Sequence, residues 1–253
     1  YLTDNQTNFL SSIGFLYSDN KWIKFIDVGI VNSIEYFSKD NITKSFLDNN
    51  KIKNNLIAKE STYKLSIERA LFPLKFKDLD IPTYIVPIKP YWASQLFDYY
   101  IAEESLFGSN PELSWNRENV YYRSVRPIEE IAPARILWYV SSSNNSNSMR
   151  RSSVVGCSYL DESHIDKPKI LFQKFKNYGT YSWSDVYKLA KNDINVDIKA
   201  LKFSDTEIFK SPIPLKKINE VLINNGRKKN TFACPLLVNN NIFNEIYFIG
   251  TNN

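Results

Sequence analysis

Hydrophobic and polar positions alternate at short spacing through most of the second half of the chain, a pattern typical of short β-strands. Two β-rich runs lie within 119–140, separated by Pro127 and Pro133. The apolar runs that follow predict further strands, at 153–163, 167–175, 196–209, 232–238 and 245–250. These runs predict a sheet of short strands in residues 119–253.

Two helices interrupt this series of strands. Ser182 stands at the N-cap position of the stretch SWSDVYKLAK, and Asp185 three residues later completes a capping box that satisfies unpaired backbone amides. The prolines of SPIPL introduce a second helix at 216–223. Short strands with two helices favour an α+β fold, in which a small mixed sheet curls into a barrel with flanking helices.

The first half has a weaker pattern. Residues 8–28 predict a helix end, a stop at Gly14 and a strand through Trp22, Ile23 and Phe25. The polar stretch 32–70 predicts a linker with one or two helices. A strand at Thr83–Ile88 and a helix over about 92–106 follow. Leu96, Tyr99, Tyr100 and Glu103 recur at three-to-four spacing along that helix, and we interpret this amphipathic, aromatic stripe as core packing.

Composition excludes several classes of function. The single histidine, His164, rules out a site of several histidines, and with Cys157 it supplies only two of the four ligands that structural zinc requires. Two cysteines make no disulfide framework, and seven scattered glycines form no phosphate-binding loop. No run is long enough to span a membrane and no signal peptide is visible, so we expect a cytoplasmic protein.

The net charge of +5 is compatible with a polyanionic partner, although an AT-rich genome would explain the lysines equally well. The chain begins at Tyr1 and its only methionine is Met149, so we expect further residues upstream.

The stretch NFLSSIGFLYSDNKWIKFIDV (8–28) resembles the closing segment of a GNAT-type acetyltransferase. That family binds acetyl-CoA through a glycine-containing loop before this helix, and no such loop occurs here. The resemblance therefore implies that 1–30 is the end of an incomplete GNAT-like module, followed by a helical linker or α/β segment at 31–118. We expect no cofactor in this chain, and acetyl-CoA only if a complete module lies upstream.

Residues 119–253 resemble the PUA-like superfamily, specifically its ASCH and EVE branches. RILWYV, VVGCSYLDE, YSWSDVYKLA and ALKFSDTEIFKSPIPLKKI carry the resemblance, which covers about 133–249. IVPIKPYWASQLFD and RENVYYRSVRP are similar to bacterial proteins that join an acetyltransferase-like module to this barrel. The resemblance implies binding of RNA or a modified base, in RNA or DNA, in a cleft between the barrel and its helices.

Candidate binding residues combine flat rings with cations, because an unpaired base stacks on aromatic faces and phosphates attract arginine. Tyr139 faces away from Trp138 along one strand and is a candidate for ligand contact. The other candidates are Trp183, Tyr122, Arg123, Arg126, Arg150 and Arg151. The alternatives are a core position for Trp138 or Trp183 and a solvated loop end for Arg150 and Arg151.

Catalysis is a competing hypothesis, since some ASCH proteins are hydrolases or nucleases. Lys202, Asp205 and Glu207, together with Lys169, would supply a lysine–carboxylate acid/base pair, provided that burial lowers the pKa of the lysine. The alternative for this charged run is a solvated strand end. A third hypothesis is a regulatory module for an N-acetyltransferase.

Overall fold

The computed structural model describes residues 3–12, 15–18, 20–24, 28–38, 61–97, 117–126, 130–142 and 150–252. The chain forms two compact units, Tyr1–Ile81 and Pro82–Asn253. The sequence placed the start of the barrel at residue 119. The structure begins the second unit earlier because the strand Thr83–Ile88 belongs to its sheet. Among the described residues, no helix is both long and apolar enough to cross a bilayer.

The first unit contains short elements. A predicted single strand through Trp22 is instead a hairpin, in which β1 (Leu16–Ser18) pairs antiparallel with β2 (Lys21–Ile23). The chain reverses at Asn20, whose φ of 60° is a left-handed turn conformation that asparagine tolerates. Phe25 lies outside the described residues. The other elements are α1 (Asp4–Ser12), β3 (Ile30–Val31), α2 (Ser33–Ser38), α5 (Ser61–Ala70) and β4 (Lys75–Phe76), and β3 pairs parallel with β4.

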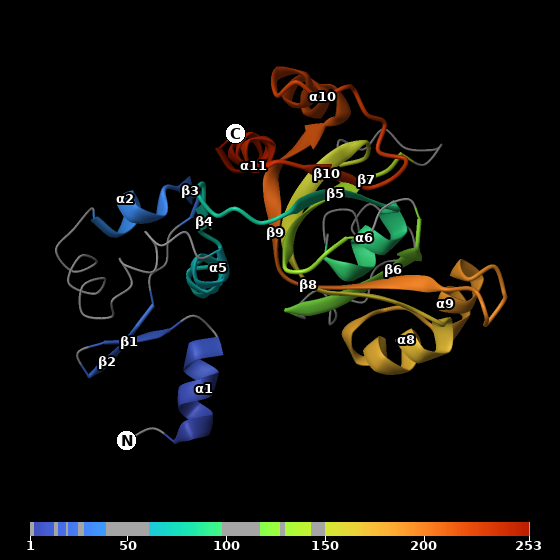
Figure 1. The fold of residues 1–253 in the computed structure, drawn as a ribbon, viewed down its shortest axis with the longest axis horizontal. Helices are drawn as coiled ribbons and strands as arrows, with labels where there is room; N and C mark the ends of the chain where they lie inside the picture. The colour runs from blue at the N-terminus through green and yellow to red at the C-terminus, as the bar shows by residue number, and fades with distance from the viewer. Residues whose placement is uncertain are drawn as a thin grey trace. The chain divides into compact units, whose positions relative to one another are not determined.

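A six-stranded mixed sheet with flanking helices makes up the second unit (Figure 1). The strand order is β10-β5-β7-β8-β9-β6; β5 pairs parallel with β7, and the other pairs are antiparallel. The α+β class and the mixed sheet are thus as predicted. The strands are β5 (Thr83–Ile88), β6 (Glu118–Ser124), β7 (Ala134–Val140), β8 (Ser153–Asp166), β9 (Ile198–Pro214) and β10 (Leu236–Val238). The helices are α6 (Pro90–Leu96), α8 (Pro168–Phe175), α9 (Trp183–Leu189), α10 (Leu215–Asn224) and α11 (Asn240–Asn252).

Trp138 lies at the centre of the core that the curled sheet encloses. Every residue of β7 is buried, as expected for a strand covered on both faces. The Trp138 ring contacts the rings of Phe97, Tyr121 and Phe203, and its indole N–H donates to the Ser158 hydroxyl at 2.8 Å. Trp138 is therefore a core residue, which was one of the two alternatives from the sequence.

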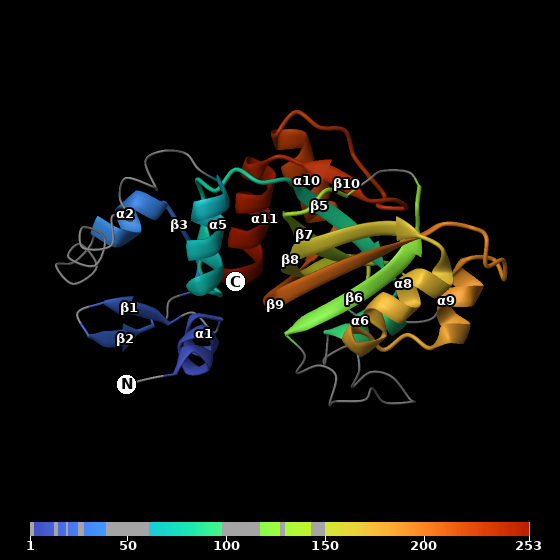
Figure 2. The same ribbon diagram turned by 60° about the horizontal axis from the view of Figure 1, so that its bottom comes forward.

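The curl brings β5 close to the edge strand β6, although the two strands share no backbone pairing among the described residues. The Tyr121 hydroxyl on β6 donates to the Pro87 carbonyl on β5 at 3.3 Å. In Figure 2, α6, α8 and α9 gather beside β6. The unit therefore has an open seam between β5 and β6, with short helices beside it.

Two predicted strands are helices. Most of the predicted strand 167–175 is α8 (Pro168–Phe175), which begins with Pro168 at its first turn and buries Leu171 and Phe175, one helical turn apart. Residues 245–250 lie within α11, which buries Phe243, Tyr247 and other residues at helical spacing. Both segments are short apolar runs, for which sequence periodicity separates helix from strand poorly.

The helix predicted at Ser182 is confirmed as α9, and its capping box is present: the Ser182 hydroxyl accepts from the Asp185 amide, and Asp185 accepts from the Ser182 amide. The helix predicted after SPIPL is confirmed as α10. Of the predicted helix at 92–106, α6 is described and the remainder, with Tyr99, Tyr100 and Glu103, lies outside the described residues.

Candidate nucleic-acid interface

A pocket of about 640 Å³ lies at the seam of the curled sheet. Five segments far apart in the sequence form its walls: the end of β5 with the start of α6, the end of β6, the residue just after β7, α9 with the residues just before it, and 232–233. The lining residues are Pro87, Ile88, Lys89, Trp92, Tyr121, Tyr122, Arg123, Ser124, Ser141, Tyr181, Asp185, Lys188, Leu189, Phe232 and Ala233.

Aromatic rings form much of the pocket wall. Trp92 stacks on Tyr181 with a centroid distance of 3.8 Å and an angle of 17° between the planes. Tyr122 meets the same Tyr181 ring edge-on at 5.0 Å, and Tyr91 meets Trp92 edge-on at 4.8 Å. Contacts of this kind hold each ring in place, so the half-buried Trp92 is a rigid flat surface at the pocket.

The Tyr181 hydroxyl is buried and has no hydrogen-bond partner within the described part of the chain. Burial raises the pKa of this hydroxyl well above its usual value, and the nearby Tyr122 amide, which lies outside hydrogen-bond geometry, opposes that rise only in part. Burial also raises the pKa of Tyr121, to about 12, and that of Tyr122. All three hydroxyls therefore stay protonated at physiological pH. Those of Tyr121 and Tyr122 donate to the carbonyls of Pro87 and Leu171, at 3.3 and 3.4 Å, whereas that of Tyr181 has no acceptor among the described residues.

Positive charges surround these rings. Lys89, Arg123 and Lys188 line the pocket, and Lys188 is exposed. Asp185, the one carboxylate among the lining residues, accepts from the Ser182 amide at 3.0 Å and from its hydroxyl at 2.7 Å. Three cations against one carboxylate leave the lining residues with a net positive charge.

A buried carboxylate fixes the position of Arg123. Glu130 forms ion pairs with Arg123 and, at 2.5 Å, with Lys199, and the side chains of Glu130 and Lys199 are fully buried. A second guanidinium nitrogen of Arg123 donates to the Arg126 carbonyl at 3.2 Å. Arg123 thus reaches the pocket as an ordered cation.

Residues 227–229 (Arg-Lys-Lys) lie just before the pocket-lining Phe232. Lys228 and Lys229 are exposed, whereas Arg227 donates to the Leu237 carbonyl at 3.0 Å. This basic run was missed from the sequence, although three consecutive cations near an aromatic residue are a recognisable signal for a polyanion.

The structure brings only part of the predicted site together. Tyr122 and Arg123 line the pocket, and Arg126 is exposed just beyond it. Tyr139 does face away from Trp138, but it is buried and packs on Phe232 at 4.8 Å.

Three further candidates lie outside the set of lining residues. Arg150 and Arg151 precede β8 and are half-buried; most of the Ser/Asn loop before them lies outside the described residues. Trp183 is 36% exposed on another side of α9. The sequence therefore did not identify Trp92, Tyr181, Lys89, Lys188 and Phe232. Tyr181 and Lys188 belong to the quoted motif YSWSDVYKLA, and Lys89 and Trp92 belong to IVPIKPYWASQLFD, but neither motif singles these residues out as binding residues.

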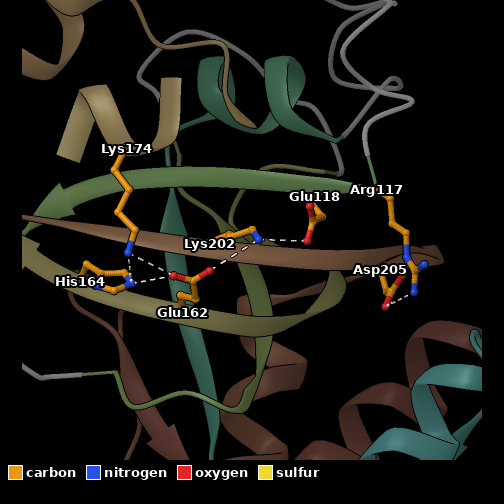
Figure 3. Close-up of polar contacts among 7 residues, drawn as sticks. All are labelled: Arg117, Glu118, Glu162, His164, Lys174, Lys202 and Asp205. Carbon is orange, nitrogen blue, oxygen red and sulfur yellow. Dashed lines mark hydrogen bonds and ion pairs between the residues drawn. The ribbon is translucent and has the colours of Figure 1, made fainter. Parts of the chain in front are cut away.

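The catalytic candidates Lys202, Asp205 and Glu207 have separate partners. Asp205 pairs with Arg117 at 2.6 Å (Figure 3), and Glu207 accepts from the Tyr247 hydroxyl at 2.9 Å. Lys169 is exposed on α8. These side chains do not form one site.

Lys202 lies between two carboxylates, 3.0 Å from Glu118 and 3.6 Å from Glu162 (Figure 3). Burial by itself would lower the pKa of Lys202, but the hydrogen bond to Glu118 and the nearby negative charges outweigh it and raise the pKa. His164 and Lys174 extend the same cluster through Glu162, at 2.7 and 3.4 Å. Lys202 is therefore held as a cation, and a cation cannot act as a general base.

No group of three or more potential metal-binding side chains (His, Cys, Asp or Glu) occurs among the residues that the structure describes.

No protein-family model matches the chain, and no curated protein matches it. Among solved structures, a mutant ASCH protein from Zymomonas mobilis is similar over 68% of this chain and 100% of its own, with 14% identity and a TM-score of 0.46. The ASCH protein from Zymomonas mobilis covers 65% and 92%, with 15% identity and a TM-score of 0.44. The N-terminal domain of Staphylothermus marinus McrB covers 65% and 92%, with 11% identity and a TM-score of 0.36. Because these scores and identities are low, the interpretation of the site depends on its own geometry.

Proposed function

We propose that the unit formed by residues 82–253 binds single-stranded nucleic acid and takes one unpaired base into the seam pocket. The observation that carries this proposal is the Trp92–Tyr181 stack at the wall of a positively charged cavity of about 640 Å³. That volume lies in the range of about 300–1,000 Å³ that is usual for sites that enclose a small organic group.

The contacts available in the pocket match the chemistry of a nucleotide. The face of Trp92 offers stacking, which contributes about 1–3 kcal/mol per base. The Tyr181 hydroxyl is buried without a partner among the described residues, and a polar base edge that reached it would accept its hydrogen bond. Lys89, Lys188 and Arg123 offer contacts to phosphate, which fix position without reading sequence.

The hydrolase alternative has less support. It requires a lysine that loses its proton near neutral pH, and the contacts of Lys202 have the opposite effect. We therefore propose binding rather than hydrolysis at this site.

Fluorescence anisotropy with labelled single-stranded RNA and DNA, at several salt concentrations, tests the proposal. We expect affinity to fall as salt rises. Trp92→Ala should weaken binding by about 5- to 150-fold, the equivalent of one lost stack. Lys188→Ala should reduce the salt dependence.

Matched controls are Phe248→Ala, which removes an aromatic ring that is 58% exposed on α11, and Lys210→Ala, which removes an exposed lysine on β9. Both control variants should bind oligonucleotides with the affinity of the wild-type protein. The proposal fails if the wild-type protein binds no oligonucleotide at low salt. It also fails if the Trp92→Ala variant binds oligonucleotides as tightly as the wild-type protein.

A further inference from the structure

Two aromatic rings on α9 do not belong to the pocket. Trp183 and Tyr187 lie one helical turn apart and stack, with centroids 5.7 Å apart and 22° between the planes. Trp183 is 36% exposed, so the protein leaves a large flat ring in contact with solvent. Asp185, Lys188 and Leu189 of the same helix do line the pocket.

The neighbouring helix α8 extends this aromatic surface. Phe172 contacts Trp183, with ring centroids 5.7 Å apart. α8 and α9 lie side by side in both overall views (Figures 1 and 2). The aromatic platform, by which we mean Phe172, Trp183 and Tyr187, thus spans two helices.

Lysines flank the aromatic platform. Lys169 and Lys176 stand three positions before and four positions after Phe172, so both lie on the side of the helical stretch that Phe172 occupies. Both lysines are exposed. Lys188, which lines the pocket, follows Tyr187 directly.

The charges of this surface favour an anionic partner. The three flanking lysines are positive, and the nearest carboxylate on α9, Asp185, is bonded to Ser182 at the helix N-terminus. Interleaved rings and cations are what single-stranded nucleic acid requires, because each base offers a flat face and each phosphate a negative charge.

The distance is also compatible with a single strand. α9 contains seven residues, which corresponds to a length of about 10 Å. One helix therefore carries both a wall of the pocket and most of the aromatic platform, within the reach of a short oligonucleotide.

We propose that the aromatic platform binds the nucleotides next to the one held in the pocket, so that the protein holds a strand rather than a free nucleoside. This inference rests on the proposed function of the pocket. It assigns a second contact region and makes affinity depend on the length of the ligand.

Isothermal titration of the full chain with uridine monophosphate and with oligouridylates of two to eight nucleotides tests the inference. In the unchanged protein, affinity should rise by at least tenfold between the mononucleotide and the longer strands. Trp183→Ala should weaken binding of the longer strands by about 5- to 150-fold and leave the affinity for the mononucleotide unaffected. Trp92→Ala should weaken both.

Trp183→Phe is the matched control, because it keeps a flat ring, and it should retain most of the length dependence. Replacing both Lys169 and Lys176 with alanine should reduce the slope of log affinity against log salt concentration for the longer strands. The expected reduction is about 1.4, at about 0.7 for each phosphate contact. Circular dichroism confirms that each variant is folded.

The outcomes separate the two proposals. Trp92→Ala could weaken binding while Trp183→Ala binds oligonucleotides of every length as tightly as the wild-type protein. In that case the proposed role of the aromatic platform is wrong and the proposed role of the pocket is retained. If no nucleotide or strand binds the unchanged protein, both fail. If Trp183→Ala alters only the oligomeric state in sedimentation, the exposed rings are a protein contact and the inference is overturned.

Discussion

Replacing Glu130 with glutamine removes a buried negative charge that pairs with both Arg123 and Lys199. The Lys199 side chain is fully buried and that of Arg123 is 11% exposed, so both cations have given up most of their hydration. A glutamine amide has nearly the same shape but carries no charge to offset them. Loss of one partner of a buried ion pair costs about 3–5 kcal/mol.

That cost is large compared with the stability of an ordinary domain, about 5–15 kcal/mol. Urea denaturation followed by tryptophan fluorescence measures it. With a urea dependence of about 2 kcal/mol per molar for a unit of this size, the midpoint should fall by about 1.5–2.5 M. Because the same carboxylate positions Arg123 at the pocket, oligonucleotide affinity should fall as well.

The matched control is Glu118→Gln. Glu118 also pairs with a lysine, Lys202 at 3.0 Å, but its side chain is 44% exposed. An exposed pair contributes at most about 1 kcal/mol, so this midpoint should move by less than about 0.5 M. Equal shifts in the two variants would refute the conclusion that the burial of Glu130 gives its charge a special role.

Three further predictions concern single positions. Tyr181→Phe should raise the thermal stability of the free protein by about 1 kcal/mol, because a buried hydroxyl without a partner is costly. The same change should weaken oligonucleotide binding. A loss of stability would contradict the conclusion that this hydroxyl has no partner. Gly250→Ala should destabilise the protein by about 1–3 kcal/mol in calorimetry, because the added carbon would overlap the Phe209 ring on β9; a gain would show that the ring moves aside. Burial would raise the pKa of Asp78, but hydrogen bonds, the largest from Lys64 at 2.7 Å, outweigh it and lower the pKa below 3.8. The contribution of Asp78 to stability is therefore present above pH 3.8 and is lost as the pH falls through the lowered pKa. Asp78→Asn should flatten the acid side of a plot of unfolding free energy against pH. An unchanged plot would refute this role of Asp78.

Local signals in the sequence were sufficient for several elements. The strand Thr83–Ile88 has the predicted bounds, and the Ser182–Asp185 capping box marks the start of α9. Alternation along β7 placed Trp138 and Tyr139 on opposite faces. These features depend on residues a few positions apart.

The remainder depends on contacts between distant segments. α8 and α11 have the apolar content of strands, and their helical form follows from packing against the sheet. The pocket combines Trp92, Tyr122, Tyr181 and Phe232 from four segments, and only the curled sheet brings those segments together. The GNAT-like origin of residues 1–30 stays a prediction.

The pairing of Ile85 with Leu236 spans about 150 residues of chain. A ribosome adds about 5–20 residues per second, so β10 is synthesised about 8–30 seconds after β5. Phe232 is synthesised only shortly before β10. A nascent chain therefore has no finished pocket until the segment that carries Phe232 and β10 has left the ribosome.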